Sequence, residues 1–249
     1  MNSIRLFCPN LAVGTSTVSE DEAHHAAVVL RARDGAAVTL FDGAGGEAAG
    51  TIVHISKRGL RVEVARVDQR PFDAAYRITL AVAMGKAHRQ GYLIEKCTEL
   101  GVAEIWPIYA ERSVARPRAS AVGKWTRRAV EAAKQSRSAW VPTIAPPQEF
   151  GVSLQRAKEF DACCITDVDA ALPPFSSFLA KQAIGGRLLV WVGPEGGWSE
   201  SERQAASGAG AIRARLATTV LRTETAAVAV CAAAALTERD ISCSPNEQK

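Results

Sequence analysis

Two loops near the C-terminal end combine glycine, hydroxyl and charged side chains in a pattern typical of ligand binding. The first covers residues 192–198 (Val-Gly-Pro-Glu-Gly-Gly-Trp) and the second covers residues 221–227 (Leu-Arg-Thr-Glu-Thr-Ala-Ala). Each follows a short apolar run that predicts a buried strand, and each precedes a predicted helix. Because α/β folds bind small ligands at such strand ends, the two loops predict one site built from consecutive crossovers.

The charged residues of these loops have either a structural or a chemical role. Glu195 can hold a hydroxyl or a cationic group of a ligand, or it is a surface residue of a tight turn. Thr223 or Thr225 can cap the following helix, and Glu224 favours the positive end of its dipole. Capping does not explain Arg222, which lies where a pocket should open.

The elements that position the loops follow from hydrophobic periodicity. Residues 1–70 predict short strands joined by glycine turns, which favours a small barrel. Residues 68–72 predict a linker, and the rest of the chain alternates strand and helix, which favours a parallel sheet with helices on both faces. The predicted strands are 38–41, 51–55, 60–64, 77–84, 104–108, 162–165, 188–192 and 215–221, and the predicted helices are 90–100, 124–137, 199–207 and 225–239, with a short helix starting at Ser19–Glu22.

Composition excludes several classes of protein. The chain of 249 residues is 47% apolar and 22% charged, which predicts a folded core. No apolar stretch reaches the length of a membrane span and no signal peptide is evident, so a cytoplasmic protein is expected. The six cysteines form no CxxC pair, which favours reduced thiols and no metal site.

Nucleotide-binding motifs are weak or missing. The sequence lacks the P-loop pattern GxxxxGK[ST]. Residues 43–48 match the loose dinucleotide pattern GxGxxA, on which a nicotinamide-dependent oxidoreductase would depend. That pattern requires a helix directly after it, whereas residues 51–55 predict a strand, so a hairpin loop is the favoured interpretation.

Basic residues are concentrated in one segment. The net charge is only +4, yet residues 112–137 contain eight Lys and Arg opposed by Glu131 alone, a local charge of +7. Such a segment is typical of a protein that binds a phosphate backbone, and it is equally typical of a solvated helix face.

The two loops resemble one known family. Residues 188–199 (Leu-Leu-Val-Trp-Val-Gly-Pro-Glu-Gly-Gly-Trp-Ser) and 220–226 (Val-Leu-Arg-Thr-Glu-Thr-Ala) are similar to the RsmE family, bacterial enzymes that methylate uracil N3 in 16S rRNA. The same family is also resembled by segments of both halves of the chain, namely residues 24–31, 41–43, 95–102, 111–113, 131–136 and 141–142, so the resemblance covers nearly the whole chain.

The resemblance implies a fold and an assembly. The family belongs to the SPOUT methyltransferases, so it implies an α/β fold whose parallel sheet ends in a C-terminal trefoil knot, over residues 73–245. It implies a PUA-like β-barrel that binds RNA over residues 1–70. It further implies a homodimer with sites completed across the interface, acting on 16S rRNA within the small ribosomal subunit. The helix 225–239 is apolar enough to pack in the core or at the dimer interface.

The resemblance also implies site residues. S-adenosylmethionine (SAM) would lie in the knot against three loops, where backbone groups read the adenine edge. The implied cofactor residues are Thr166, Val192, Gly193, Gly197, Leu216, Leu221, Arg222, Thr225 and Ala226. Arg222 would stabilise the uracil anion, with Glu195 or Glu224 as candidate general base. The RNA path would include Arg31, Arg33, Arg112, Arg116, Arg127 and Arg128.

One segment departs from the family pattern. Relatives have Leu-Gly-x-Arg before Ile/Val-Leu-Arg, whereas this chain has Ala217 in place of the glycine and Thr219 in place of the first arginine. The departure implies a tighter cofactor loop or weaker RNA contact. It favours one alternative, a catalytically silent RNA-binding protein with this fold. A ribose 2′-O methyltransferase is a second alternative, against which the resemblance over the whole chain argues.

Overall fold

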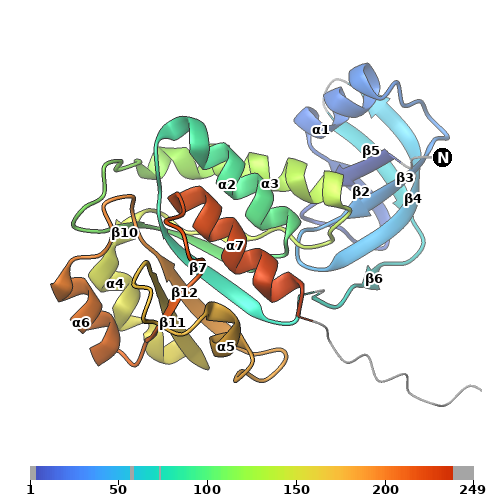
Figure 1. Cartoon of the computed structure of the whole chain (residues 1–249). Coiled ribbons are helices and arrows are strands. Elements are labelled where there is room, and N and C mark those ends of the chain that lie inside the picture. Colours follow the sequence, from blue (N-terminus) through green and yellow to red (C-terminus); the bar gives the residue numbers. More distant parts are fainter. Residues whose placement is uncertain (1–3, 57–58, 73, 238–249) are drawn as a thin grey trace, which may run out of the picture.

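The computed structural model describes residues 4–56, 59–72 and 74–237. It contains two sheets, an N-terminal sheet from strands between residues 4 and 69 and a C-terminal sheet from strands between residues 77 and 215. Figure 1 shows the N-terminal sheet beside one end of the helices that cover the C-terminal sheet.

The N-terminal sheet has the strand order β1-β3-β4-β5-β2, with β6 paired to β4. β1 and β3 are parallel and the other pairs are antiparallel. On β5 the buried Leu60, Val62 and Val64 alternate with exposed residues, which confirms the predicted period of two. Its elements are β1 (Ile4–Phe7), β2 (Gly14–Val18), α1 (Glu20–His24), the π-helical turn η1 (His25–Val29), β3 (Ala37–Phe41), β4 (Gly46–Ser56), β5 (Gly59–Val64) and β6 (Asp68–Gln69).

The C-terminal sheet is entirely parallel, as predicted. Its strand order is β10-β8-β7-β12-β11-β13, with β9 paired to β8. The strands are β7 (Arg77–Ala83), β8 (Glu104–Tyr109), β9 (Thr143–Ile144), β10 (Gln148–Glu149), β11 (Ala162–Asp167), β12 (Arg187–Val192) and β13 (Ile212–Arg215). β12 is central and its side chains from Leu188 to Val192 are at most 1% exposed, which explains its continuous apolar run.

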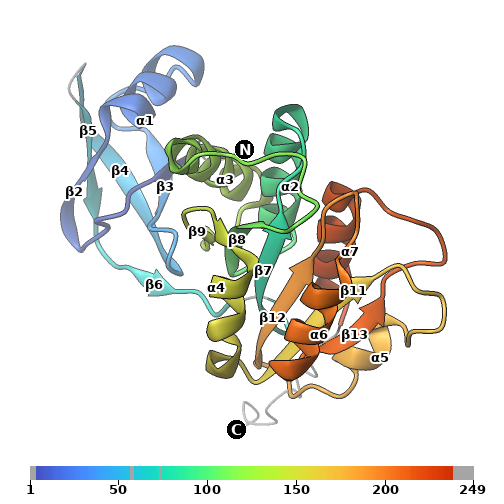
Figure 2. The same ribbon diagram turned by 90° about the vertical axis from the view of Figure 1, so that its left-hand side faces the viewer.

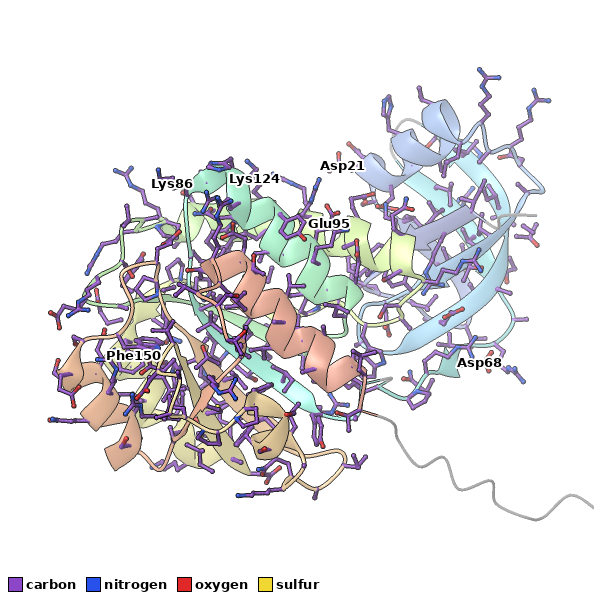
Figure 3. The ribbon with its side chains drawn as sticks, viewed as in Figure 1. Asp21, Asp68, Lys86, Glu95, Lys124 and Phe150 are labelled. Carbon is purple, nitrogen blue, oxygen red and sulfur yellow. The ribbon has the colours of Figure 1, made fainter. Side chains whose placement is uncertain are left out.

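Helices cover both faces of this sheet (Figure 2). Apolar side chains of α2, α3, α5 and α7 form one core, which includes Leu93, Trp125 and Val230. Side chains of α4 and α6 form the other with Trp106 and Trp191, and Figure 3 shows Phe150 on that side. The helices are α2 (Ala87–Glu99), α3 (Val122–Ser136), α4 (Phe150–Gln155), α5 (Phe175–Leu179), α6 (Glu200–Gly208) and α7 (Thr223–Ala235), with 3₁₀ turns η2 (Ala119–Ala121) and η3 (Ala157–Glu159).

Three predictions on local structure need correction. The predicted strand 215–221 is wrong, because β13 ends at Arg215 and the β-branched residues after it form a loop with Val220 78% exposed. The linker 68–72 contains β6, which pairs with β4. The capping box at Ser19 is only half formed. The Glu22 N–H donates to the Ser19 hydroxyl, but the Glu22 carboxylate accepts from the Phe7 N–H instead of from the Ser19 N–H. The extension of the last helix to 239 and the boundary at 245 lie outside the described residues.

The two sheets are joined by specific contacts at the C-terminal end of α3. Lys134 of α3 forms an ion pair with Glu22 of α1, and the side chains are 7% and 11% exposed. Arg5 Nη2 donates to the Ser138 carbonyl at 2.9 Å, and the Val141 N–H donates to the Gly43 carbonyl at 2.9 Å. The GxGxxA segment is therefore a hairpin loop packed on the domain junction, as predicted.

Candidate active site

The carboxyl ends of β11, β12 and β13 surround one cavity of about 510 Å³, a volume that includes its part open to solvent. The end of β11 contributes Thr166 and Asp167, the loop after β12 contributes Gly193 and Trp198, and the loop between β13 and α7 contributes Leu216. The two loops singled out in the sequence thus meet a third at the strand ends, where α/β folds bind small ligands.

Hydrogen bonds fix the three loops to one another. The Trp198 indole N–H donates to the Thr166 carbonyl at 2.8 Å, and the Thr166 hydroxyl donates to the Trp191 carbonyl at 3.0 Å. The Thr223 hydroxyl donates to the Gly193 carbonyl at 3.0 Å. All of these donors belong to residues that are at most 7% exposed, so the walls of the cavity are preorganised.

Glycine is required in the first loop for two reasons. A Cβ on Gly193 would lie 2.9 Å from the Trp198 indole, so only glycine allows the strand to pass this ring. Gly197 has a φ of +68°, a left-handed conformation that L side chains rarely adopt. The following helix α6 begins with the predicted capping box of Ser199 and Glu202.

Seven of the nine residues predicted to contact the cofactor line this cavity. They are Thr166, Val192, Gly193, Gly197, Leu216, Leu221 and Ala226. Thr225 and Arg222 are both exposed and do not line it. The lining residues that sequence reasoning did not name as cofactor contacts are Asp167, Val168, Pro194, Trp198, Ala217, Thr219 and Thr223. Asp167 and Val168 directly follow a predicted strand, a position that could have indicated them.

Asp167 is held by two arginines at the edge of the cavity. Its Oδ2 accepts from Arg203 Nε at 2.8 Å and from Arg213 Nη2 at 2.9 Å, and its side chain is 4% exposed. Burial raises the pKa of this carboxyl, but hydrogen bonds from Arg203, the Val168 N–H and Arg213 outweigh burial and hold the pKa below its ordinary value of 3.8. Asp167 is therefore an ionised anchor that joins β11, α6 and β13.

The two candidate bases share a partner that sequence reasoning missed. Arg89 on α2 lies with its Nε 3.4 Å from Glu224 Oε1 and its Nη1 3.9 Å from Glu195 Oε1. Glu224 is 8% exposed, and its Oε2 is a buried oxygen with no hydrogen-bond partner. Nothing in the spacing of Arg89 indicates this contact, because α2 is distant in sequence from both loops.

Arg222 occupies the N-cap position of α7 with an extended backbone, and its side chain is exposed. The first helical residue, Thr223, directs its hydroxyl to Gly193 instead of capping the helix. Its neighbours Leu221 and Thr223 both line the cavity, which places Arg222 at the cavity edge.

The basic segment is less free than its charge suggests. Arg128 pairs with Glu95, Arg116 pairs with Glu149 at 3.2 Å, and Lys134 is buried against Glu22. Arg112 Nη1 donates to the Gly196 carbonyl at 3.2 Å, which places it at the first cofactor loop. Arg127 is exposed on α3, and Figure 3 shows Lys124 and Lys86 at the end of the molecule where α3 and α2 begin. Arg31 and Arg33 are exposed on the N-terminal sheet domain, away from these residues.

Comparison with known proteins defines the class. Residues 73–235 match the family model of the RNA methyltransferase domain, and residues 18–65 match that of the RNA methyltransferase PUA domain. The fold and the site are thus those of an RNA methyltransferase with an N-terminal PUA domain. The ribosomal RNA small subunit methyltransferase E of Mycobacterium tuberculosis is 36% identical over 232 residues, which cover 90% of this chain and 87% of that protein. The chain belongs to the ribosomal RNA small subunit methyltransferase E family, the RsmE family of the sequence resemblance.

Solved structures agree with this assignment. The Neisseria gonorrhoeae member of the family, crystallised with bound SAM, is 30% identical with a TM-score of 0.81, and the match covers 93% of this chain and 96% of that one. A Legionella pneumophila methyltransferase structure with SAM is 28% identical with a TM-score of 0.83 and the same coverage.

Proposed function

We propose that this protein transfers a methyl group from SAM to N3 of a uridine in 16S rRNA. The observation that carries the proposal is the cavity enclosed by three hydrogen-bonded loops at the carboxyl ends of β11, β12 and β13. Two structures similar over nearly their whole length have SAM bound, and the relatives are named for small-subunit rRNA.

The residues of the cavity fit SAM. Val192, Leu216, Leu221 and Ala226 provide apolar walls for an adenine ring, and the backbone of the glycine loop provides polar edges. Gly197 leaves open space where a side chain would stand, which lets a ligand approach the backbone. When bound, SAM would supply an electrophilic methyl group on its sulfonium. Arg222 and Thr225 would contact it only from the rim.

The chain must also prepare its nucleophile. N3 of uracil carries a proton and becomes nucleophilic when that proton leaves, which places negative charge on the adjacent oxygens. Arg222, exposed at the edge of the cavity, would stabilise this charge as an electrostatic catalyst.

A carboxylate would accept the N3 proton. Glu224 is supported as the acceptor because its Oε2 is unpartnered while its Oε1 is held by Arg89. Glu195, the more exposed of the two, is the second candidate on the same arginine.

RNA would reach the cavity along the basic side chains around it. Arg112 and Arg127 are supported as RNA contacts by their exposure near the cavity end of the sheet. Arg116 and Arg128 are supported because their ion pairs are exposed to solvent, so a phosphate can replace the carboxylate partner. Arg31 and Arg33 would contact RNA on the PUA domain. The uracil must be unpaired or flipped to place N3 beside the methyl group.

The proposal includes an architecture: a PUA domain over residues 1–70, a methyltransferase domain over residues 73–245 and a trefoil knot formed by its C-terminal part. It also includes a homodimer, supported by Tyr92 of α2, 50% exposed, and Leu236 after α7, 82% exposed. The substrate would be 16S rRNA in the small ribosomal subunit of the cytoplasm.

Mass-spectrometric mapping of 16S rRNA tests the function. The purified protein is incubated with isotopically labelled SAM and with small subunits from a strain that lacks the gene. We expect label in 3-methyluridine at one position. Label in a 2′-O-methylribose, or SAM binding by calorimetry without any transfer to RNA, would contradict the proposal.

A further inference from the structure

A second cavity opens at the opposite end of the C-terminal sheet, where β7, β8 and β12 begin and the PUA domain docks. It measures about 730 Å³, including its part open to solvent. Arg77, Glu104 and Arg187 come from the first residues of the three strands, while Gly43 comes from the PUA domain and Trp140 from the segment after α3. The cavity is therefore a junction of both domains.

Two arginines line this cavity from neighbouring strands. Arg77 and Arg187 are register partners on the neighbouring strands β7 and β12, and both are exposed. Within the described part of the chain, neither guanidinium has a carboxylate within ion-pair distance. Like charges at opposed positions of a sheet repel, and an anion bound beside this pair would relieve the repulsion.

Aromatic rings hold the two guanidinium groups. Arg77 lies over Phe72 at 4.5 Å and over Trp140 at 5.2 Å, and Arg187 lies over Phe160 at 5.2 Å, measured from Cζ to the ring centroid. The Trp140 indole N–H donates to the Pro71 carbonyl at 3.1 Å, which fixes the ring. A guanidinium group that lies over an aromatic ring keeps the N–H donors of its own plane free, and these donors suit phosphate recognition.

The remaining polar groups of the cavity suit a sugar or a base. Glu104 lines it, as do the hydroxyl-bearing residues Thr79 and Thr143. One Glu104 oxygen already accepts from the Trp106 indole at 2.9 Å. Two donors for an anion, an aromatic surface and a carboxylate acceptor are together the groups that recognise a nucleotide.

We propose that this cavity binds a nucleotide of the RNA strand, with its phosphate between Arg77 and Arg187. The inference rests on the proposed function insofar as RNA is the substrate. The cavity lies at the amino ends of the strands and the cofactor cavity at their carboxyl ends, a separation of roughly 20 Å for a strand of this length. The nucleotide held here is thus several positions from the methylated uridine, and the site anchors RNA beside the PUA domain.

Fluorescence anisotropy with a labelled single-stranded oligouridylate tests the site. The full-length protein is compared with R77Q, R187Q and R77Q/R187Q over a range of salt concentrations. We expect the double variant to bind about tenfold more weakly, because charge-assisted hydrogen bonds to the phosphate are removed. The slope of log affinity against log salt should fall by about 0.7 for each phosphate that is no longer neutralised.

The matched control is R66Q, because Arg66 is exposed on the PUA domain, pairs with Asp68 and lies outside the cavity. R187K retains the charge and should retain most of the salt slope. Unfolding temperature shows whether each variant is folded. Calorimetry with UMP and with uridine distinguishes a free nucleotide from a nucleotide of an RNA strand as the ligand. If R77Q loses binding of UMP but keeps its affinity for oligouridylate, the assignment to an RNA strand is wrong.

Methyl transfer is measured separately, so the two proposals fail separately. If R77Q/R187Q binds oligouridylate as tightly as the unaltered protein, with the same salt slope, this inference is wrong while the methyltransferase remains. If the unaltered protein transfers no methyl group but the double variant binds RNA more weakly, the proposed reaction is wrong while the RNA site remains.

Discussion

Arg89 and Glu224 form an ion pair, Nε to Oε1 at 3.4 Å, that connects the first turn of α2 to the first turn of α7. The same guanidinium reaches Glu195 in the glycine loop at 3.9 Å. One side chain thus links both loops that the sequence singled out. It also holds one oxygen of Glu224 while leaving the other without a partner.

Replacing Arg89 by Ala should reduce turnover more than SAM affinity. The variant loses the link between Glu224 and Glu195, and it leaves Glu224 nearly buried without a counter-charge. We expect a destabilisation of about 1–3 kcal/mol and a fall in kcat, measured by urea unfolding and by transfer to small subunits. R89K keeps the charge and should retain most of the stability and most of the kcat. An equal kcat in R89A and the unaltered protein would exclude a positioning role for Arg89.

Replacing Gly193 by Ala should weaken SAM binding. The new Cβ would lie 2.9 Å from the Trp198 indole, so the ring must move and its hydrogen bond to the Thr166 carbonyl at 2.8 Å is strained. We expect at least a tenfold rise in the SAM Kd by calorimetry, a change of about 1.4 kcal/mol. G151A is the control, since the same methyl group meets nothing within 4 Å on α4; G193A with an unchanged Kd would contradict the packing argument.

Replacing Asp167 by Asn should remove stability that depends on pH. Because the pKa of Asp167 is lowered in the folded protein, its contribution is fully present above the ordinary value of 3.8 and is lost as pH falls through the lower folded value. D167N should therefore unfold at a lower temperature than the unaltered protein at neutral pH. The difference between the two unfolding temperatures should shrink below about pH 4. A difference that grows toward acid would show that the pKa of Asp167 is raised, not lowered, by folding.

Replacing Lys134 by Ala should loosen the junction between the domains. Glu22 would remain nearly buried without its partner, which costs about 3–5 kcal/mol when one member of a buried pair is removed. The double variant E22Q/K134M removes both charges and should recover much of that loss in thermal unfolding. K134A as stable as the unaltered protein would show that the pair contributes nothing to docking.

Thr219→Arg introduces the arginine that the family resemblance implies at this position. Thr219 is exposed at the cavity edge, so an arginine there can reach RNA. We expect tighter RNA binding and a salt slope steeper by about 0.7, with the SAM Kd unchanged, in anisotropy and calorimetry. A weaker SAM affinity with no gain for RNA would show that Thr219 serves the cofactor loop instead.

Local patterns predicted the elements that carry their own signal. Continuous burial marks β12, the Ser199–Glu202 box marks the start of α6, and Gly101 with a φ of +76° marks the end of α2. The prediction of a strand over 215–221 was wrong because β-branched residues also suit an extended loop: Val220 is 78% exposed, and Thr219 lines the cavity.

Long-range pairing was not predictable from these patterns. Arg89, Arg203 and Arg213 each meet a carboxylate from another element, and only the folded chain brings them together. For the same reason the eight basic residues of 112–137 looked like one uniform stripe. The fold directs Arg112 to the cofactor loop, Lys134 to the PUA junction, and Arg116 and Arg128 to surface ion pairs.

The docking of the PUA domain at the amino ends of the strands sets the distance between the junction cavity and the cofactor cavity. Lys134 with Glu22 and Arg5 with the Ser138 carbonyl clamp that domain to the far end of α3, while the cofactor loops lie where α2 and α3 begin. An RNA bound as proposed in the junction cavity would present to the cofactor cavity a nucleotide that its folded shape places one strand length away. In the proposed complex, target choice would depend on the distance in the folded ribosomal RNA between the anchored nucleotide and the methylated uridine.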